Sequence, residues 1–149
     1  MWNQQRDRIM KAEELMIGDW VHYRGTNIQV TSLYDKGGSN EIGWSDKESV
    51  WVNGSNVEPI PLTPEILEKN GFETEDNAHF SIQGQDNILE LLLVESPFDS
   101  YTFDIVRTER TVNKCNQRCY IDRYFASIDY VHQLQHALKL CGINKDILL

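Results

Sequence analysis

Two cysteines and two histidines near the end of the chain have the spacing of a zinc motif, Cys115-x3-Cys119-x12-His132-x3-His136. Thiolate and imidazole are the usual ligands of structural zinc, and the spacing matches a zinc finger with two cysteines and two histidines. Such a finger also needs apolar core residues between its ligand pairs, but Arg123 and Asp129 occupy those places. The sequence therefore argues against a zinc finger, while a zinc-binding module of another geometry stays open as an alternative.

The same two histidines lie one helical turn apart in His132-Gln-Leu-Gln-His136, as in the zinc-binding helix of metalloproteases. That helix needs a glutamate directly after the first histidine, where it serves as general base for the zinc-bound water. Gln133 stands there and cannot accept a proton at neutral pH. Both histidines also fall opposite the apolar stripe of Val131, Leu134, Leu138 and Cys141, so we expect them to be exposed. We expect no catalytic residue, no cofactor and no enzyme activity.

The remaining candidates for a binding site are aromatic and basic side chains, namely Trp20, Tyr23, Trp44, Trp51, Arg107 and Arg110. Exposed aromatic rings on a small barrel can hold a peptide. Together with arginine they can also stack a base and neutralise a phosphate. The alternative is that the rings form the core and the basic residues balance the acidic middle of the chain. A protein partner is the favoured hypothesis, and a small nucleotide ligand, sequestered in phage counter-defence, is the alternative.

Charge and hydropathy exclude several classes of protein. The 149 residues carry a formal net charge of -9, and residues 64–104 hold ten acids against one base. Such a chain repels the phosphate backbone, which disfavours generic nucleic-acid binding. The longest apolar run, Leu91–Val94, is too short for a membrane span, and the first ten residues lack the apolar core of a secretory signal. We expect a cytoplasmic protein with reduced cysteines, and an oligomer stays open.

Periodicity predicts an α+β fold whose first half is all β. Residues 1–9 are predicted to be a flexible tail. Residues 10–62 contain five short alternating segments, at residues 20–23, 28–33, 41–44, 49–52 and 57–62. Five short strands in so few residues predict a small SH3-like antiparallel β-barrel.

Residues 63–149 are predicted to form an antiparallel sheet with a packed C-terminal helix, either as a separate domain or sharing one core with the barrel. Thr63 and Pro64 begin a helix that ends at Gly71. Strands are expected at residues 79–82, 88–95, 101–107 and 118–125, followed by a helix over 127–141 and a short tail. The nearly continuous apolar run at 88–95 predicts a central strand covered on both faces.

Three stretches resemble a family of small uncharacterised proteins from gut anaerobic bacteria and their phages or mobile elements. They are MKAEELMIGD at residues 10–19, EPIPLTPEILEKNGF at 58–72 and YVHQLQHALKLCGI at 130–143. The resemblance spans both ends and the middle of the chain. It implies a phage or mobile-element origin and supplies no catalytic residue. The residues before Met10 and the loop near Cys115 depart from the family pattern.

Overall fold

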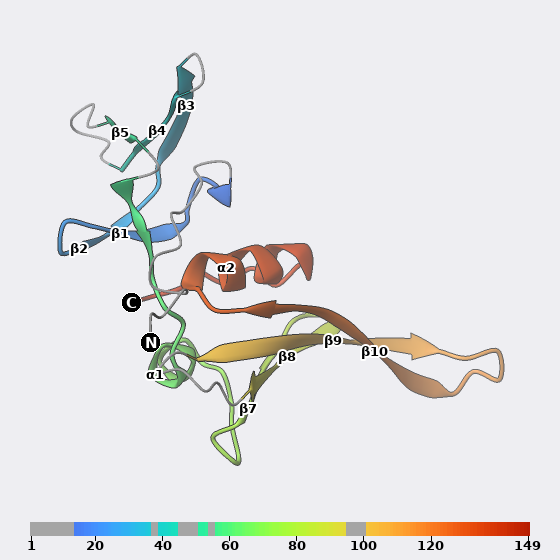
Figure 1. The fold of residues 1–149 in the computed structure, drawn as a ribbon. Helices are drawn as coiled ribbons and strands as arrows, with labels where there is room; N and C mark the ends of the chain where they lie inside the picture. Colours follow the sequence, from blue (N-terminus) through green and yellow to red (C-terminus); the bar gives the residue numbers. More distant parts are fainter. Residues whose placement is uncertain (1–13, 37–38, 45–50, 54–55, 95–100) are drawn as a thin grey trace. The chain divides into compact units, whose positions relative to one another are not determined.

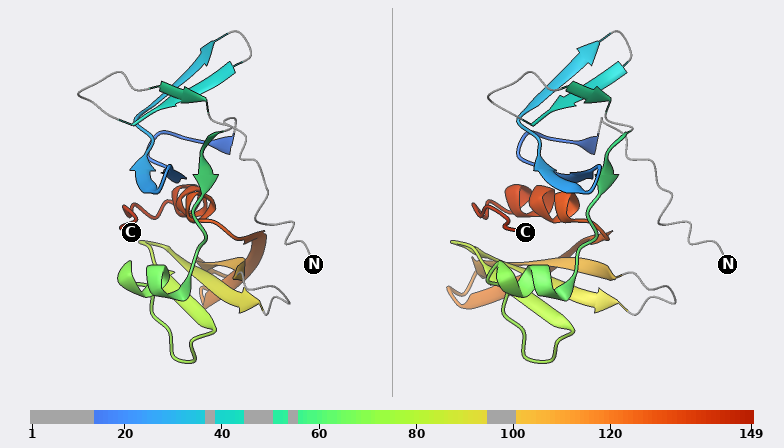
Figure 2. Two further views of the ribbon diagram at one scale, coloured as in Figure 1. Left: turned by 60° about the vertical axis from the view of Figure 1, so that its left-hand side comes forward. Right: turned by 90° about the vertical axis from the view of Figure 1, so that its left-hand side faces the viewer.

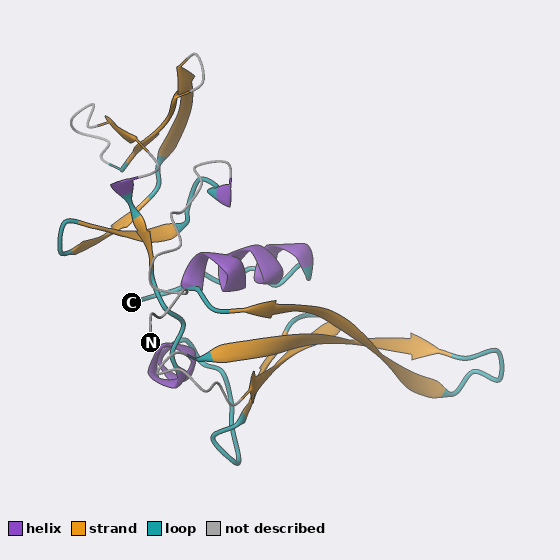
Figure 3. Cartoon of the chain, in the orientation of Figure 1, coloured by secondary structure: helices purple, strands orange, loops and turns teal. Residues whose placement is uncertain are grey.

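The computed structural model describes residues 14–36, 39–44, 51–53, 56–94 and 101–149 (Figure 1). The chain divides into two compact units, Met1–Ile60 and Pro61–Leu149, which we call unit 1 and unit 2. Antiparallel sheets and two helices make up the described part (Figure 3), which confirms the predicted α+β class. The predicted flexible tail at residues 1–9 lies outside the described residues.

Unit 1 contains two three-stranded antiparallel sheets with the orders β2-β1-β6 and β3-β4-β5. The predicted segment 28–33 is split between them, because the backbone N–H of Val30 donates to Asp19 O at 2.8 Å and that of Thr31 donates to Gly43 O at 2.8 Å. The described strands do not close into a barrel, so the SH3-like barrel is not confirmed. The strands are β1 (Trp20–Tyr23), β2 (Thr26–Gln29), β3 (Ser32–Lys36), β4 (Ser39–Gly43), β5 (Trp51–Asn53) and β6 (Glu58–Pro59).

One small hydrophobic core holds unit 1 together. Its buried members come from strands of both sheets and from the segments beside them, and they are Leu15, Val21, Ile28, Val30, Ile42 and Val57. Tyr23 and Trp44 are partly buried and pack against this core. These two rings therefore contribute to the packing of unit 1.

Unit 2 is a four-stranded antiparallel sheet of order β10-β9-β8-β7, with a helix over one face (Figure 2). Its C-terminal helix begins later than predicted, at Val131, because Ile128 still pairs with Phe103 in the sheet. The Gln133 side chain then accepts the backbone N–H groups of Asp129 and Tyr130 at 2.8 and 3.1 Å. The elements are α1 (Pro64–Lys69), β7 (His79–Gln83), β8 (Asn87–Val94), β9 (Thr102–Val112), β10 (Arg118–Ile128) and α2 (Val131–Leu140).

The two faces of this sheet differ. Paired positions share a face in an antiparallel sheet, so the register places these buried residues on one face, which we call the inner face: Phe80, Leu89, Leu91, Phe103 and Ile105. The other face, the outer face, leaves Leu92 38% exposed and Val94 exposed as well. β8 is central as predicted, but the prediction that both its faces are covered is wrong. An apolar run alone cannot report that one face lacks a covering layer.

The segment after α2 is fixed to α1. Asn70 is buried and its side-chain amide donates to Ile66 O at 2.8 Å and to Leu148 O at 2.7 Å. Its Oδ1 accepts the backbone N–H of Leu148 at 2.7 Å, and Ile147 is buried. The predicted short tail is therefore part of the fold of unit 2. Neither described helix has the length and apolar character that a membrane crossing requires.

Candidate functional site

The cysteines and histidines of the zinc pattern lie in different parts of unit 2. Cys115 is in the turn between β9 and β10, where its N–H donates to Asn113 Oδ1 at 2.9 Å, and Cys119 is in the first residues of β10. Nine steps along the strand lead from Cys119 to Ile128, about 30 Å at the rise of a β-strand. His132 and His136 are on α2, away from this turn (Figure 1). Within the described part of the chain, no three histidine, cysteine or acidic side chains gather in a way that could hold a metal ion.

His132 is buried, at 2% exposure, so the prediction that it lies on an exposed polar face is wrong. Its ring stacks on Tyr130, with centroids 5.9 Å apart and planes at 12°. His136 is half-buried and contacts the His132 ring edge-on, with centroids 5.8 Å apart. The buried face of α2 is therefore wider than its apolar stripe, because it also includes His132. The ring of His132 packs in the interior through its aromatic face.

Two of the predicted aromatic residues contact each other in unit 1. The Tyr23 and Trp44 rings lie 5.3 Å apart between centroids, tilted by 50°. The guanidinium of Arg24 lies 5.2 Å from the centroid of Tyr23, a cation–π distance. Trp20 is half-buried on β1. Trp51 is in β5, but its side chain lies outside what the structure describes.

The two predicted arginines are in unit 2, whereas the aromatic residues are in unit 1. Arg107 is half-buried, forms an ion pair with Glu109 at 2.6 Å and donates to Asn87 Oδ1 at 3.3 Å. Arg110 is exposed on β9. Of the basic residues near it, Lys114, Arg118 and Arg123 form no ion pair with another described residue. The ion-pair partner of Arg107, Glu109, lies outside the acidic residues 64–104, so the balance between the basic stretch and the acidic middle stays a prediction.

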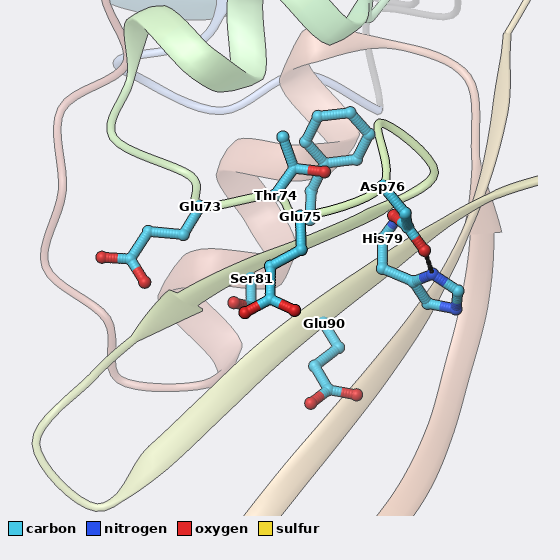
Figure 4. A pocket seen from close by; sticks show the side chains of 8 residues that line it. Glu73, Thr74, Glu75, Asp76, His79, Ser81 and Glu90 are labelled. Carbon is cyan, nitrogen blue, oxygen red and sulfur yellow. Dashed lines mark hydrogen bonds and ion pairs between the residues drawn. The ribbon is translucent and has the colours of Figure 1, made fainter.

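A shallow pocket beside β7 is acidic and contains one oriented histidine (Figure 4). Asp76 Oδ2 contacts His79 Nδ1 at 2.5 Å. The carboxylates of Glu73 and Glu90 point away from this pair in Figure 4. An oriented histidine suits proton transfer, but the described structure brings no hydroxyl or thiol into hydrogen-bond contact with its ring. The negative charge of the pocket also opposes a phosphate ligand.

The Asp76 carboxylate is held by the loop that precedes β7. Its Oδ1 accepts the backbone N–H of His79 at 2.7 Å and that of Ala78 at 2.9 Å. The His79 backbone bond, then the Ala78 bond and the His79 side chain, lower the pKa of Asp76 from 3.8 to about 2. Hydrogen bonds that favour the ionised form have this effect. Asp76 is thus the cap that fixes the entry into β7.

We expect the carboxyl carbon of Asp76 to titrate in NMR with a midpoint of about 2. The folded pKa is lower than the ordinary value of 3.8, so Asp76 contributes stability above that pH and loses it as the pH falls through about 2. The Asp76→Asn variant should show a flatter dependence of unfolding free energy on pH over this window. A wild-type midpoint close to 3.8 would contradict the assignment.

β10 is a largely exposed strand that forms one edge of the sheet of unit 2. Nine of its eleven residues are exposed, and the β9–β10 hairpin extends well beyond α2 (Figure 1). The large apolar side chains exposed on this strand are Tyr120, Ile121, Tyr124 and Phe125, with Tyr120 62% and Tyr124 64% exposed. A long exposed edge is a template for another strand. The register shift between Tyr124 and Ala126 ends the regular edge.

The hydrogen-bond pattern shows which backbone groups of β10 face the open edge. Asn113 N–H donates to Gln117 O at 2.9 Å, so this pair closes the hairpin. Bonded pairs alternate along an antiparallel ladder, so Cys119, Ile121 and Arg123 bond to β9. The N–H and C=O groups that remain for a partner belong to Arg118, Tyr120, Asp122 and Tyr124.

Several side chains beside this edge are held in place on the outer face. The Tyr124 hydroxyl contacts Ser127 Oγ at 3.0 Å, and Ser127 donates to Asp104 Oδ1 at 2.5 Å. Thr108 donates to Asp122 Oδ1 at 2.7 Å. Rigid aromatic side chains lose little entropy when they are covered, so this surface is preorganised for contact. This surface was not predicted from the sequence, although Tyr120 and Tyr124 alternate with charged residues on one face of the strand.

Comparison with known proteins adds no assignment to this geometry. No protein-family model matches the chain, and neither the curated proteins nor the solved structures yield a match. The residues of the chain itself therefore carry the functional argument.

Proposed function

We propose that this chain is a non-enzymatic protein-binding protein that takes up a partner strand along the free edge of β10. The observation that carries the proposal is the exposed edge itself, with the backbone groups of Arg118, Tyr120, Asp122 and Tyr124 directed outward. Strand addition to an exposed edge is a common mode of recognition, in which the backbone supplies affinity and the side chains supply specificity. The proposal places the protein in the cytoplasm.

The side chains beside the edge have the composition of a contact surface. Tyrosine and arginine are enriched among the residues that dominate binding energy at protein interfaces. Tyr120 pairs with Arg110 across the hairpin, and Arg118 pairs with Val112, which is also exposed. This mixture of ring, apolar and basic groups supports a protein partner. The resemblance of residues 10–19, 58–72 and 130–143 to phage and mobile-element proteins supports such an origin, and an SH3-like arrangement of unit 1 stays a prediction.

The proposal is tested by affinity capture from the source cells with wild type and with Tyr120→Pro. Proline removes an outward N–H while an edge strand tolerates it, so the variant should fold and lose the captured protein. Leu140→Ser is the matched control, because Leu140 is 68% exposed but lies on α2. Capture that is equal for wild type and Tyr120→Pro, or no capture at all by a folded protein, would refute the proposal.

A second candidate function, nucleotide binding, is favoured by the Tyr23–Trp44 pair with Arg24 beside it. The two rings are half-buried, and Arg24 is exposed and forms no ion pair with another described residue. A base could stack on the rings while the guanidinium contacts a phosphate. The site proposed here uses Arg24 instead of Arg107 and Arg110, which belong to the other unit.

A thermal-shift screen with nucleotides and cyclic nucleotides tests this second function. A ligand that binds the folded state must raise the melting temperature, and Arg24→Gln should reduce the shift. Wild-type protein that shows no shift with any nucleotide at millimolar concentration would exclude it.

A further inference from the structure

We propose that two copies of this chain pair antiparallel through their β10 edges, with Tyr120 on the twofold axis. The inference rests on the proposed function, because it names a second copy of the chain as the partner that adds a strand. The pairing would join two four-stranded sheets into one continuous sheet. A twofold contact of this kind uses the same surface on both copies and therefore closes the edge.

The position of the axis follows from charge. A twofold axis perpendicular to the sheet at Tyr120 places Arg118 of each copy directly opposite Asp122 of the other. These residues share the outer face and have outward backbone groups, so their pairing also forms edge hydrogen bonds. Opposite charges in directly paired positions stabilise a sheet. The arrangement contains this ion pair twice.

Other axis positions lose this complementarity. An axis at Asp122 or at Arg123 places two like charges opposite each other, which destabilises the pairing. An axis at Ile121 places Arg118 opposite Tyr124 and Asp122 opposite Tyr120, so it forms no ion pair. Charge therefore favours the register with Tyr120 on the axis. Arg118 and Asp122, which form the ion pairs in this register, have no ion-pair partner among the described residues.

The remaining pairs across the axis are compatible with the same register. The two Tyr120 rings would lie side by side on the outer face, where each is 62% exposed in the single chain. Cys119 would lie opposite Ile121, and Arg123 opposite Gln117. Thr108 occupies only Oδ1 of Asp122, so Oδ2 stays available to Arg118 of the second copy.

Disulfide trapping tests the register. Cys115 and Cys119 are first replaced by serine, and the buried Cys141 is kept. In this background Tyr120→Cys should form an intermolecular disulfide about tenfold faster than Tyr124→Cys, because paired Cα atoms about 5.5 Å apart lie within disulfide reach. Tyr124 is the matched control, since it is equally exposed on the same strand. Equal rates for the two variants would overturn the proposed axis.

Charge reversal tests the pairing without new cysteines. Sedimentation equilibrium of the wild type, from micromolar to millimolar concentration, should show a monomer–dimer equilibrium. Arg118→Asp should weaken the dimer about tenfold, because two attractions between directly paired side chains become two repulsions. Adding Asp122→Arg should restore dimerisation, and circular dichroism checks that each variant is folded.

The two proposals fail in distinguishable ways. A wild type that stays monomeric at millimolar concentration, or a double variant that is no better than Arg118→Asp, overturns the self-pairing. Capture of another protein that still depends on Tyr120 would then leave strand addition at β10 intact. Self-association that is insensitive to Tyr120→Pro would show that the dimer does not use this edge.

Discussion

Replacing Leu134 with alanine should lower the free energy of unfolding by about 2–5 kcal/mol, because the side chain is fully buried and its loss leaves a cavity. Leu134 lies in the middle of α2, whose other buried apolar residues are Val131, Ala137 and Leu138. Urea unfolding followed by circular dichroism measures the difference.

Leu140→Ala is the matched control for this experiment. It makes the same substitution on the same helix, but Leu140 is 68% exposed, so its cost should stay within about 0.5 kcal/mol. His136→Ala is also expected to cost less than Leu134→Ala, since its side chain is only half-buried. A control as damaging as Leu134→Ala would show that the loss does not come from burial of the side chain, and helix propensity cannot account for it because alanine is the better helix former.

Asn70→Ala should destabilise the protein by about 2–4 kcal/mol, because it leaves the backbone N–H and C=O of Leu148 without their side-chain partner. The amide bond to Ile66 O is lost in the same variant. Hydrogen exchange at the Leu148 amide should accelerate together with the loss of stability. This would identify Asn70 as the residue that fastens the end of unit 2.

Lys69→Ala provides the comparison. Lys69 donates to Leu149 O at 2.6 Å, but that bond is exposed, so its removal should cost no more than about 0.5 kcal/mol. If both variants unfold at the same urea concentration, the buried hydrogen bonds of Asn70 contribute no more to stability than the exposed bond of Lys69.

The local elements of unit 2 could be predicted because their signals are local. Thr63, Pro64 and Gly71 bound α1, and Thr63 Oγ1 accepts the Ile66 N–H at 3.4 Å as the cap requires. The start of α2 could not be placed correctly, because it depends on the pairing of Ile128 with Phe103 on another strand. Boundaries set by tertiary pairing are not visible in a single segment.

The surface features were predicted less well than the elements. The burial of His132 depends on the Tyr130 ring that stacks against it and on a buried helix face wider than the apolar stripe. The exposed edge at β10 depends on the strand order, which no residue of β10 encodes by itself. The sequence therefore indicated Arg107 and Arg110 on β9 as binding residues, whereas the outward backbone N–H and C=O groups lie on the neighbouring strand β10.

The bond between Asn70 and Leu148 has a consequence for synthesis on the ribosome. The two residues are 78 positions apart, so α1 is synthesised long before the C-terminal segment that forms hydrogen bonds with Asn70. Strand pairs within unit 1 involve only residues that have left the ribosome before Leu148 is made. Domains generally fold as units in the order of their synthesis, so unit 1 can fold first. The contact between Asn70 and Leu148 can form only after Leu148 has left the exit tunnel, and until then the apolar inner face of the sheet is a surface for a chaperone to shield.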